Sequence, residues 1–511
     1  MSGRPNILVI MADQLNPAFL PAYGHAVAKT PNLDRLAEAG VVFERAYCNS
    51  PLCAPSRASF MTGLLPSQTG VYDNAAPMGA DIPTFAHVLR GQGYHTVLSG
   101  KMHFAGPDQL HGFDERLTTD IYPADFEWTP DWTRPDERPS WYHNMSSVTE
   151  AGTCVRSNQL DFDDEVVFQA VRKLFGIARG DDDPPFCMVV ALTHPHDPFA
   201  IPARYYDLFR DEDVDLPALG ADDVEADPHS ARLRHVYAVG EGVVTDEDVR
   251  RARRAYLGAI AYVDAQAGLV LDALEQAGLA EDTIVVFTAD HGEMLGERGL
   301  WYKMNFFEGS ARVPLVVRGP GVPPGRVEAS VSLVDLLPSF AELAGTAPAL
   351  PVEGRSLVPH LQGGEGPDGV VAEYLAEGTV HPAVMIRRER WKFVHAPPDP
   401  DQLYDLDADP REVRNLAAVP EHAAVCAAFR SEIGRRWDLP ALKEAVLRSQ
   451  ARRRQVASAL RRGRPVAWDH QPAPDAHRTY VRNHMTLDAI EARARFPRVV
   501  PPAGTPTREQ T

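Results

Sequence analysis

Short apolar runs alternate with longer amphipathic stretches along most of this chain. The apolar runs cover residues 7–11, 97–99, 188–193 and 284–288. Runs of this length are typical of strands that are buried on both faces of a sheet. Stretches with helical spacing lie between them, at residues 32–39, 82–92, 163–178 and 246–277. The alternation predicts an α/β fold in which helices flank a large, mostly parallel central sheet.

The last quarter of the chain has a different pattern. Strand-like runs at 384–388, 391–395 and 402–406 are separated by polar and proline-rich turns, as in a small antiparallel meander. From about residue 421 the sequence is helical and rich in arginine, which favours a solvated helix face or a subunit contact over a polyanion site. We expect a large α/β domain over 1–380, an antiparallel subdomain that begins over 381–420, and a helical extension and tail over 421–511.

The net charge and the cysteines of the chain indicate which kinds of partner and which cellular compartment to expect. The net charge of −19 would repel a phosphate backbone, so we expect no nucleic-acid partner. The five cysteines are scattered and lack C-x-x-C spacing, which favours a reducing compartment. The apolar run near the N-terminus is too short for a signal peptide, and no later run is expected to span a bilayer. We therefore expect a cytoplasmic protein without a membrane partner.

Polar side chains follow each of the four apolar runs. They are Asp13, Lys101 with His103, His194 with His196, and Asp290 with His291. A single aspartate after a strand is more often a helix cap or a turn residue. In open α/β sheets, however, ligands bind at the carboxyl ends of the strands, so four such positions together indicate a site.

Several of these residues have the chemistry of metal ligands. Asp13, Asp290 and His291 offer carboxylate and imidazole groups, and Gln14 could add an amide oxygen. This mixture suits Ca²⁺, Mg²⁺ or Mn²⁺, and Zn²⁺ less well. The absence of a thiolate cluster in the sequence argues against a closed structural zinc site.

The strongest local signal is the segment 50–63, Ser-Pro-Leu-Cys-Ala-Pro-Ser-Arg-Ala-Ser-Phe-Met-Thr-Gly. Pro55 can begin a helix whose first amides would point toward an anion near Cys53, and Arg57 can add a forked, permanently charged clamp. The alternative is a buried structural cysteine followed by a surface arginine. The segment resembles the C-x-P-S-R and T-G signature of the formylglycine-dependent sulfatases of the alkaline phosphatase superfamily.

The resemblance implies a catalytic domain, a cofactor and a set of site residues. A separate maturase, the formylglycine-generating enzyme or another, would oxidise Cys53 to an aldehyde. One hydroxyl of the aldehyde hydrate would attack sulfur, and the other would later expel sulfate. One divalent ion, first of all Ca²⁺, with Mg²⁺ or Mn²⁺ as alternatives, would be held by Asp13, Gln14, the modified Cys53, Asp290 and His291. The implied sulfate binders are Arg57, Lys101, His103, His194 and Lys303.

Two roles stay open within this resemblance. Either His103 or Lys303 would protonate the departing alkoxide. His196 competes with His194 for the sulfate-binding role.

Other stretches point to a branch of this family. Many arylsulfatases carry an acidic pair after the first strand and Asp-Asn after the later one, whereas this chain has Asp13-Gln14 and Asp290-His291. These pairs are similar to those of choline sulfatases and of phosphonate monoester hydrolases. Longer stretches resemble choline sulfatases, among them 99–103, 106–113, 117–126, 303–312, 468–472 and 482–485, although Ser56 stands where alanine is expected. The resemblance implies hydrolysis of choline-O-sulfate to choline and inorganic sulfate.

Recognition of a quaternary ammonium group would need aromatic faces and carboxylates, because the group has no hydrogen-bond donor. Six aromatic residues lie between 122 and 143, namely Tyr122, Phe126, Trp128, Trp132, Trp141 and Tyr142, although each could equally pack an irregular insertion. The resemblance implies the substrate-binding residues Trp128, His143, Asn144, Glu373 and Asp488. Asp488 lies in a tail that reaches a neighbouring subunit in the family, which implies a homo-oligomer, either a dimer or a tetramer.

Alternative functions follow from the same signature. A tetrahedral anion beside a metal and an aldehyde could also be phosphate, as in a phosphonate monoester or phosphodiester hydrolase, and the ester could be another alkyl or aryl sulfate. A binding protein without activity is not expected, because it would be free to lose signature residues that this chain retains.

Overall fold

The computed structural model describes residues 4–180, 184–240, 244–463 and 467–473, together with single positions 480, 489, 491, 492 and 496. Asp488 and the stretch 482–485, which the sequence analysis singled out, lie outside the described residues.

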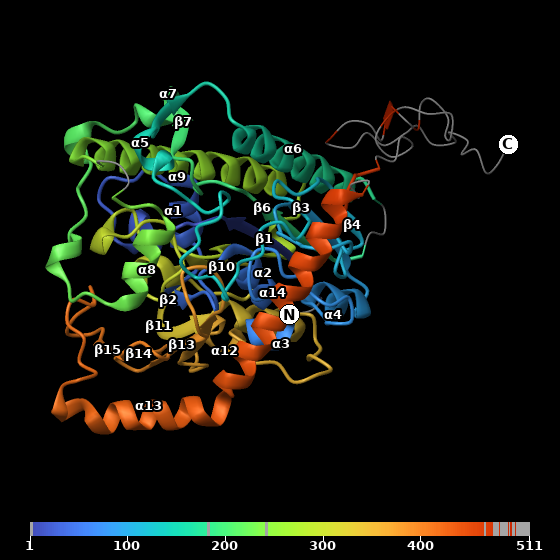
Figure 1. The fold of residues 1–511 in the computed structure, drawn as a ribbon. Coiled ribbons are helices and arrows are strands. Elements are labelled where there is room, and N and C mark those ends of the chain that lie inside the picture. Colours follow the sequence, from blue (N-terminus) through green and yellow to red (C-terminus); the bar gives the residue numbers. More distant parts are fainter. Residues whose placement is uncertain are drawn as a thin grey trace.

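A nine-stranded mixed sheet forms the centre of the protein (Figure 1). Its order is β11 (Gly325–Ser332), β2 (Val41–Tyr47), β10 (Leu315–Arg318), β8 (Thr283–Ala289), β1 (Asn6–Ala12), β6 (Phe186–Ala191), β3 (His95–Gly100) and β4 (Glu115–Arg116), with β9 (Arg312–Val313) beside β2. The neighbours β8, β1, β6 and β3 are all parallel, whereas β10 is antiparallel to both of its neighbours. The mostly parallel sheet predicted from the apolar runs is confirmed.

Helices cover both faces of this sheet because its central strands are apolar on both sides. Every residue of β6 and β8 is buried. One helical layer holds α1 (Pro31–Glu38), α6 (Asn158–Ala178) and α9 (Asp246–Gln276), and the other holds α2 (Cys53–Thr62), α4 (Phe85–Gly91) and α11 (Leu336–Leu343) (Figure 1). The predicted helices at 32–39, 82–92, 163–178 and 246–277 correspond to α1, α4, α6 and α9.

Helix α9 is long and apolar enough to cross a membrane by length and composition alone, although no such segment was predicted. In the structure, 78% of its most apolar window is buried inside the protein. It packs against α1 and α6 and is therefore apolar as a core helix of this fold.

A four-stranded antiparallel sheet follows the central domain. It consists of β12 (Val370–Tyr374), β13 (Ala383–Arg388), β14 (Trp391–His395) and β15 (Gln402–Asp405). The three predicted strands are present, and β12 joins the sheet from before residue 381 because it pairs antiparallel with β13. Two helices come next, α13 (Ala423–Arg436) and α14 (Leu439–Arg462), and α14 runs back along the main domain (Figure 1).

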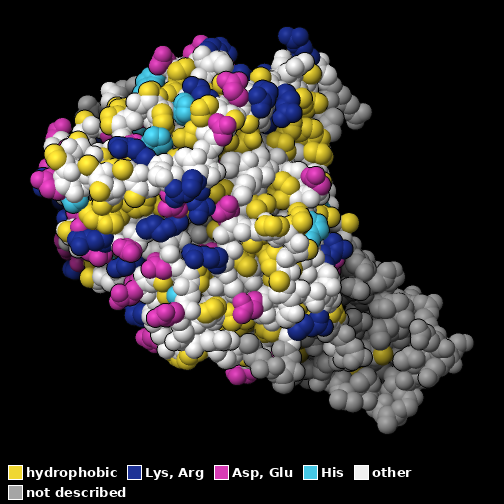
Figure 2. All heavy atoms as spheres, turned by 90° about the horizontal axis from the view of Figure 1, so that it is seen from below, with side chains coloured by type: hydrophobic (Ala, Val, Ile, Leu, Met, Phe, Trp, Pro, Cys, Tyr) yellow, Lys and Arg dark blue, Asp and Glu magenta, His cyan; other side chains and the backbone are white. Residues whose placement is uncertain are grey.

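The face seen from below carries interspersed basic and acidic side chains (Figure 2). Ion pairs attach α13 to the region of the small sheet, including Arg430 with Asp401 at 2.6 Å and Arg388 with Glu432 at 3.0 Å. This face therefore presents mixed charge, which is unlike the continuous basic surface that nucleic-acid binding requires.

Candidate active site

The carboxyl ends of the four parallel strands bring the predicted polar residues together. Asp13 directly follows β1, Asp290 follows β8, Lys101 follows β3, and His194 lies just beyond β6. Because these strands are adjacent and parallel, their ends meet at one edge of the sheet. Each of the four residues is at most 1% exposed.

Helix α2 places Cys53 and Arg57 at this edge. The helix begins at Cys53, not at Pro55 as predicted, after Leu52 in extended backbone. The Arg57 guanidinium is fully buried and donates from Nε to Asp290 Oδ2 at 2.9 Å and from Nη2 to Asp13 Oδ2 at 3.1 Å. Arg57 is therefore no surface charge, and it fixes the two carboxylates relative to Cys53.

The side chains at this position fit a divalent metal ion. Ligand atoms of Asp13, Cys53, Asp290 and His291 all lie within 4.8 Å of one another. Within the described part of the chain, Oδ1 of Asp13 is buried without a hydrogen-bond partner, which leaves one carboxylate oxygen available for an ion. Two carboxylates and an imidazole suit a cation that prefers oxygen and nitrogen ligands.

Gln14 adds an amide whose direction is set by its neighbours. Its Nε2 donates to Asp197 at 3.3 Å and also to Glu293, and its Oε1 accepts from Lys303. The backbone of Gln14 is left-handed, with φ of 62°, an uncommon conformation that tends to occur at functional sites. The amide oxygen therefore faces the cationic side of the site.

Positive charge dominates the surroundings of Cys53. Burial by itself would raise the pKa of the Cys53 thiol, but Lys101, Lys303 and His291 lower it well below its ordinary value. Burial would likewise raise the pKa of Asp13, and the charge of Lys101 lowers it overall. A site that stabilises an anion at position 53 is also suited to a sulfate group there.

Two histidines have imidazole nitrogens free to meet a ligand. His194 donates from Nδ1 to Asp163 Oδ2 at 2.7 Å, and its Nε2 is buried without a partner among the described residues. Both ring nitrogens of His103 are also buried without a hydrogen-bond partner among the described residues. Asp163, a residue of α6 that the sequence analysis missed, fixes the ring orientation of His194.

Lys303 and His196 meet on another side of the site. Lys303 Nζ donates to His196 Nε2 at 2.8 Å. Asp197 lies beyond them, with its Oδ1 3.2 Å from His196 Nδ1. The structure therefore brings both His194 and His196 to the site, in different positions, and adds Asp197, which nothing in the local sequence distinguished from a turn residue.

An aromatic wall, which we define as Tyr122, Trp128 and Trp141, borders this centre. The ring centroids of Tyr122 and Trp128 are 5.2 Å apart, and Trp128 stacks on Trp141 at 6.4 Å. The wall adjoins two of the predicted sulfate binders, because the ring of His103 lies 6.0 Å from Trp128 and Lys101 Nζ lies 4.2 Å above the Tyr122 ring. An apolar, electron-rich surface thus lies beside the anion-binding groups.

His143 and Asn144 occupy the edge of the same region. His143 stacks on Tyr302 with centroids 4.4 Å apart, and its Nδ1 lies 3.3 Å from Asp197 Oδ2. Asn144 is exposed, and its Oδ1 accepts from Ser146 N at 2.8 Å, as in a turn. Their roles as substrate ligands remain predictions.

Two glutamates near the small sheet differ in what they face. Glu373 is fully buried in β12 and accepts from Ser67 N at 2.7 Å and from Trp437 Nε1. Its role as a substrate ligand stays a prediction. Burial raises the pKa of Glu377 to about 7, and the charges of Lys303 and Cys53 also act on that pKa. Both residues follow the same apolar run, and the sequence does not distinguish them.

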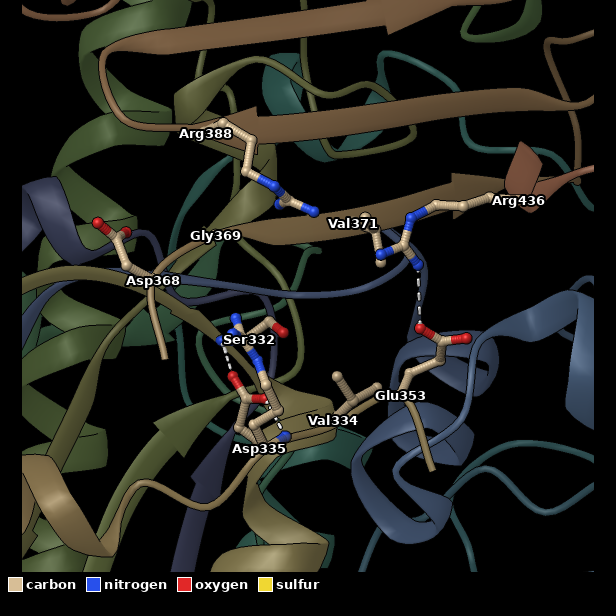
Figure 3. A pocket seen from close by; sticks show the side chains of 10 residues that line it. Ser332, Val334, Asp335, Glu353, Asp368, Gly369, Val371, Arg388 and Arg436 are labelled. Carbon is tan, nitrogen blue, oxygen red and sulfur yellow. Dashed lines mark hydrogen bonds and ion pairs between the residues drawn. The ribbon is translucent and has the colours of Figure 1, made fainter. Parts of the chain in front are cut away.

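A separate cavity of about 250 Å³ lies beside β12 (Figure 3). Arg436 points across it to Glu353, with Nη1 and Oε2 3.3 Å apart, and Arg388 enters from β13. Arg388 and Arg436 both donate to Glu432 at 3.0 Å. The two arginines are thus paired with carboxylates. The ion pairs around this cavity connect the small sheet and α13 to the main domain, which indicates a structural role.

Comparisons with known proteins agree with this geometry. Residues 5–346 match the family model described as Sulfatase, and residues 444–496 match the model described as Choline sulfatase enzyme C terminal. Residues 296–437 match the model of the C-terminal region of N-sulphoglucosamine sulphohydrolase.

Similar proteins cover most of the chain. It is 50% identical to the Choline-sulfatase of Rhizobium meliloti over 97% of this chain and 99% of that protein. It is 30% identical to a Sulfatase of Formosa agariphila over 81% of this chain and 83% of that protein. The solved Phosphonate Monoester Hydrolase of Agrobacterium radiobacter is similar with a TM-score of 0.68 and 30% identity, over 87% of this chain and 96% of that one. The chain belongs to the sulfatase family of sulfuric ester hydrolases, on its choline-sulfatase branch.

Proposed function

We propose that this protein hydrolyses choline-O-sulfate to choline and inorganic sulfate. The observation that carries the proposal is the juxtaposition of two recognition surfaces. Cationic side chains surround Cys53, where a sulfate would lie, and the aromatic wall adjoins them through His103 and Lys101. We infer that Glu377, whose pKa responds to the charges of Lys303 and Cys53, supplies the negative charge for the cation. This combination matches an ester that is anionic at one end and quaternary ammonium at the other. The similarity to the Choline-sulfatase of Rhizobium meliloti supports the same substrate.

The residues at the anionic end have separate tasks. Lys101 and Lys303 neutralise the sulfate oxygens, and His194 presents Nε2 to them while Asp163 holds its Nδ1. Asp13, Gln14, Asp290 and His291 would hold one divalent ion, first of all Ca²⁺, together with the modified Cys53. When present, the ion supplies Lewis-acid charge and the aldehyde supplies the hydrated nucleophile that attacks sulfur.

The departing choline oxygen must receive a proton. His103 and Lys303 both stay candidates for this acid, since each lies beside the sulfate-binding groups. His103 also contacts the aromatic wall through Tyr122 and Trp128, with ring centroids 5.2 and 6.0 Å apart. These contacts support His103 as the acid, because in the proposed binding mode it would lie between the sulfate and the ammonium end, beside the leaving oxygen.

The wider setting belongs to the same proposal. Cys53 is 1% exposed in α2, so we infer that a formylglycine-generating enzyme or another maturase acts on it before the chain has folded. The five cysteines are free thiols, which supports a cytoplasmic location. We also propose a homo-oligomer, with Asp488 as a ligand supplied to a neighbouring subunit.

The proposal is tested with purified protein in which mass spectrometry has confirmed the aldehyde at position 53. Turnover is compared for choline-O-sulfate, an aryl sulfate and a phosphonate monoester, with Cys53→Ala as the inactive control. The similarity to phosphonate monoester hydrolases makes the third substrate the main competitor. We expect the highest kcat/KM for choline-O-sulfate, and a higher value for either of the others would refute the substrate assignment.

A further inference from the structure

Helix α14 lies along the chain segment that carries Trp128. Arg453 on this helix is 4% exposed, and its guanidinium donates to both carboxylate oxygens of Asp73 at 2.7 Å. The same Nη1 donates to Thr129 Oγ1 at 3.0 Å. Thr129 is the next residue after Trp128, so a buried, forked cation holds the side chain adjacent to the tryptophan.

A second contact lies one turn of α14 earlier. Gln450 is fully buried, and its Oε1 accepts from the backbone N–H of Trp132 at 3.0 Å. The Trp132 ring packs with Val446 and Leu375 in a small apolar cluster. The helix therefore holds both ends of the segment 129–132.

Trp132 connects this segment to the loop that carries Glu377, the proposed negative partner of the cation. Its Nε1 donates to the Ala376 carbonyl at 2.8 Å, and Ala376 precedes Glu377. The aromatic wall and the Glu377 carboxylate come from loops far apart in sequence, and α14 and Trp132 hold the two together. The negative charge of Asp73 also acts on Glu377: burial and this charge both raise the pKa of the Glu377 carboxyl.

Two further arginines of α14 form more exposed ion pairs with the same chain segment. Arg454 pairs with Asp131, and Arg461 Nη1 lies 2.8 Å from Glu127 Oε2. Arg461 is 65% exposed, and such pairs contribute little because water screens them. The buried Arg453 and Gln450 therefore carry the positioning.

We propose that α14 is a positioning element for the cation site, and that Arg453 and Gln450 determine substrate preference through Trp128 and Glu377 without touching the substrate. The proposal deepens the proposed function and rests on it for the nature of the cation. It gives a physical role to the helical part of the region that matches the choline sulfatase C-terminal model, because residues 444–496 include both positioning residues.

The test compares Arg453→Ala, Arg453→Lys and Gln450→Ala with Arg448→Ala, an exposed arginine of the same helix. Arg453→Lys keeps a positive charge near Asp73 but loses the fork that also reaches Thr129, so it covers the case in which Arg453→Ala fails to fold. Kinetics are measured with choline-O-sulfate and with its isostere in which carbon replaces the ammonium nitrogen. This isostere, called neutral for its uncharged head group, keeps the sulfate ester. Backbone amide exchange is followed over residues 126–134.

We expect the Arg453 and Gln450 variants to raise KM for choline-O-sulfate by about tenfold or more, with kcat and the KM of the neutral isostere little changed. Amide exchange at 126–134 should quicken in these variants and stay unchanged in Arg448→Ala. Unchanged exchange in both Arg453 variants, or an equal rise in KM for the two esters, overturns the proposal. If the wild-type enzyme does not prefer the cationic ester, the proposed function fails, and amide exchange alone decides whether α14 positions the wall.

Discussion

Replacing Trp128 by alanine removes one face of the aromatic wall and leaves Tyr122 and Trp141 in place. Trp128 is half-buried, so a cation against it would be partly desolvated. Cation–π attraction is about 0.5–1 kcal/mol at exposed sites and about 2 kcal/mol when desolvated, which brackets the loss at about 1–2 kcal/mol. Since about 1.4 kcal/mol corresponds to a tenfold change, KM for choline-O-sulfate should rise by about 5- to 30-fold.

The assay separates charge recognition from packing by comparing two esters of the same shape. Initial rates are measured with choline-O-sulfate and with its neutral carbon isostere, which fills the same space but lacks the positive charge. We expect the KM of the isostere to change far less than that of the choline ester. In Trp128→Phe, which keeps an aromatic face, most of the loss should be recovered.

A control variant distinguishes this effect from general destabilisation. Trp391 is also a half-buried tryptophan, but it lies on the small sheet in β14. Trp391→Ala should leave the ratio of the two KM values unchanged. The reasoning is refuted if Trp128→Ala raises both KM values equally, because the ring would then only pack the insertion.

Further predictions concern the metal, the titration of the site and two buried networks. Chelation should abolish turnover and lower the melting temperature, because an ion bound only by the folded state stabilises it, and restoration by Ca²⁺, Mg²⁺ or Mn²⁺ will rank the ions. KM for the cationic ester relative to its isostere should fall as pH rises through about 7, since Glu377 attracts a cation only when ionised, and Glu377→Gln should remove this dependence. Asp163→Asn should lower kcat by about tenfold to a hundredfold at an unchanged melting temperature, because His194 loses its charged partner. Lys392→Met should lower the free energy of unfolding in urea by about 3–5 kcal/mol, because the buried Glu412 and the partly buried Glu308 lose their shared cation.

Much of the fold and the chemical centre could be predicted from local sequence. Strands buried on both faces leave continuous apolar runs, and a parallel arrangement of them brings Asp13, Lys101, His194 and Asp290 to one edge. Cys53 was recognisable from its own segment, since the anion-binding helix start and its clamp lie within a few residues of one another.

What the sequence by itself determined, then, is the α/β scaffold and the group of residues at its strand ends, because both follow from short-range patterns. The tertiary structure alone decided that Asp163 orients His194, and that Arg453 and Gln450 of α14 contact the segment next to Trp128. The Arg453–Asp73 pair joins positions 380 residues apart. Contacts of that kind depend on how whole elements pack, and no local periodicity in the chain encodes them.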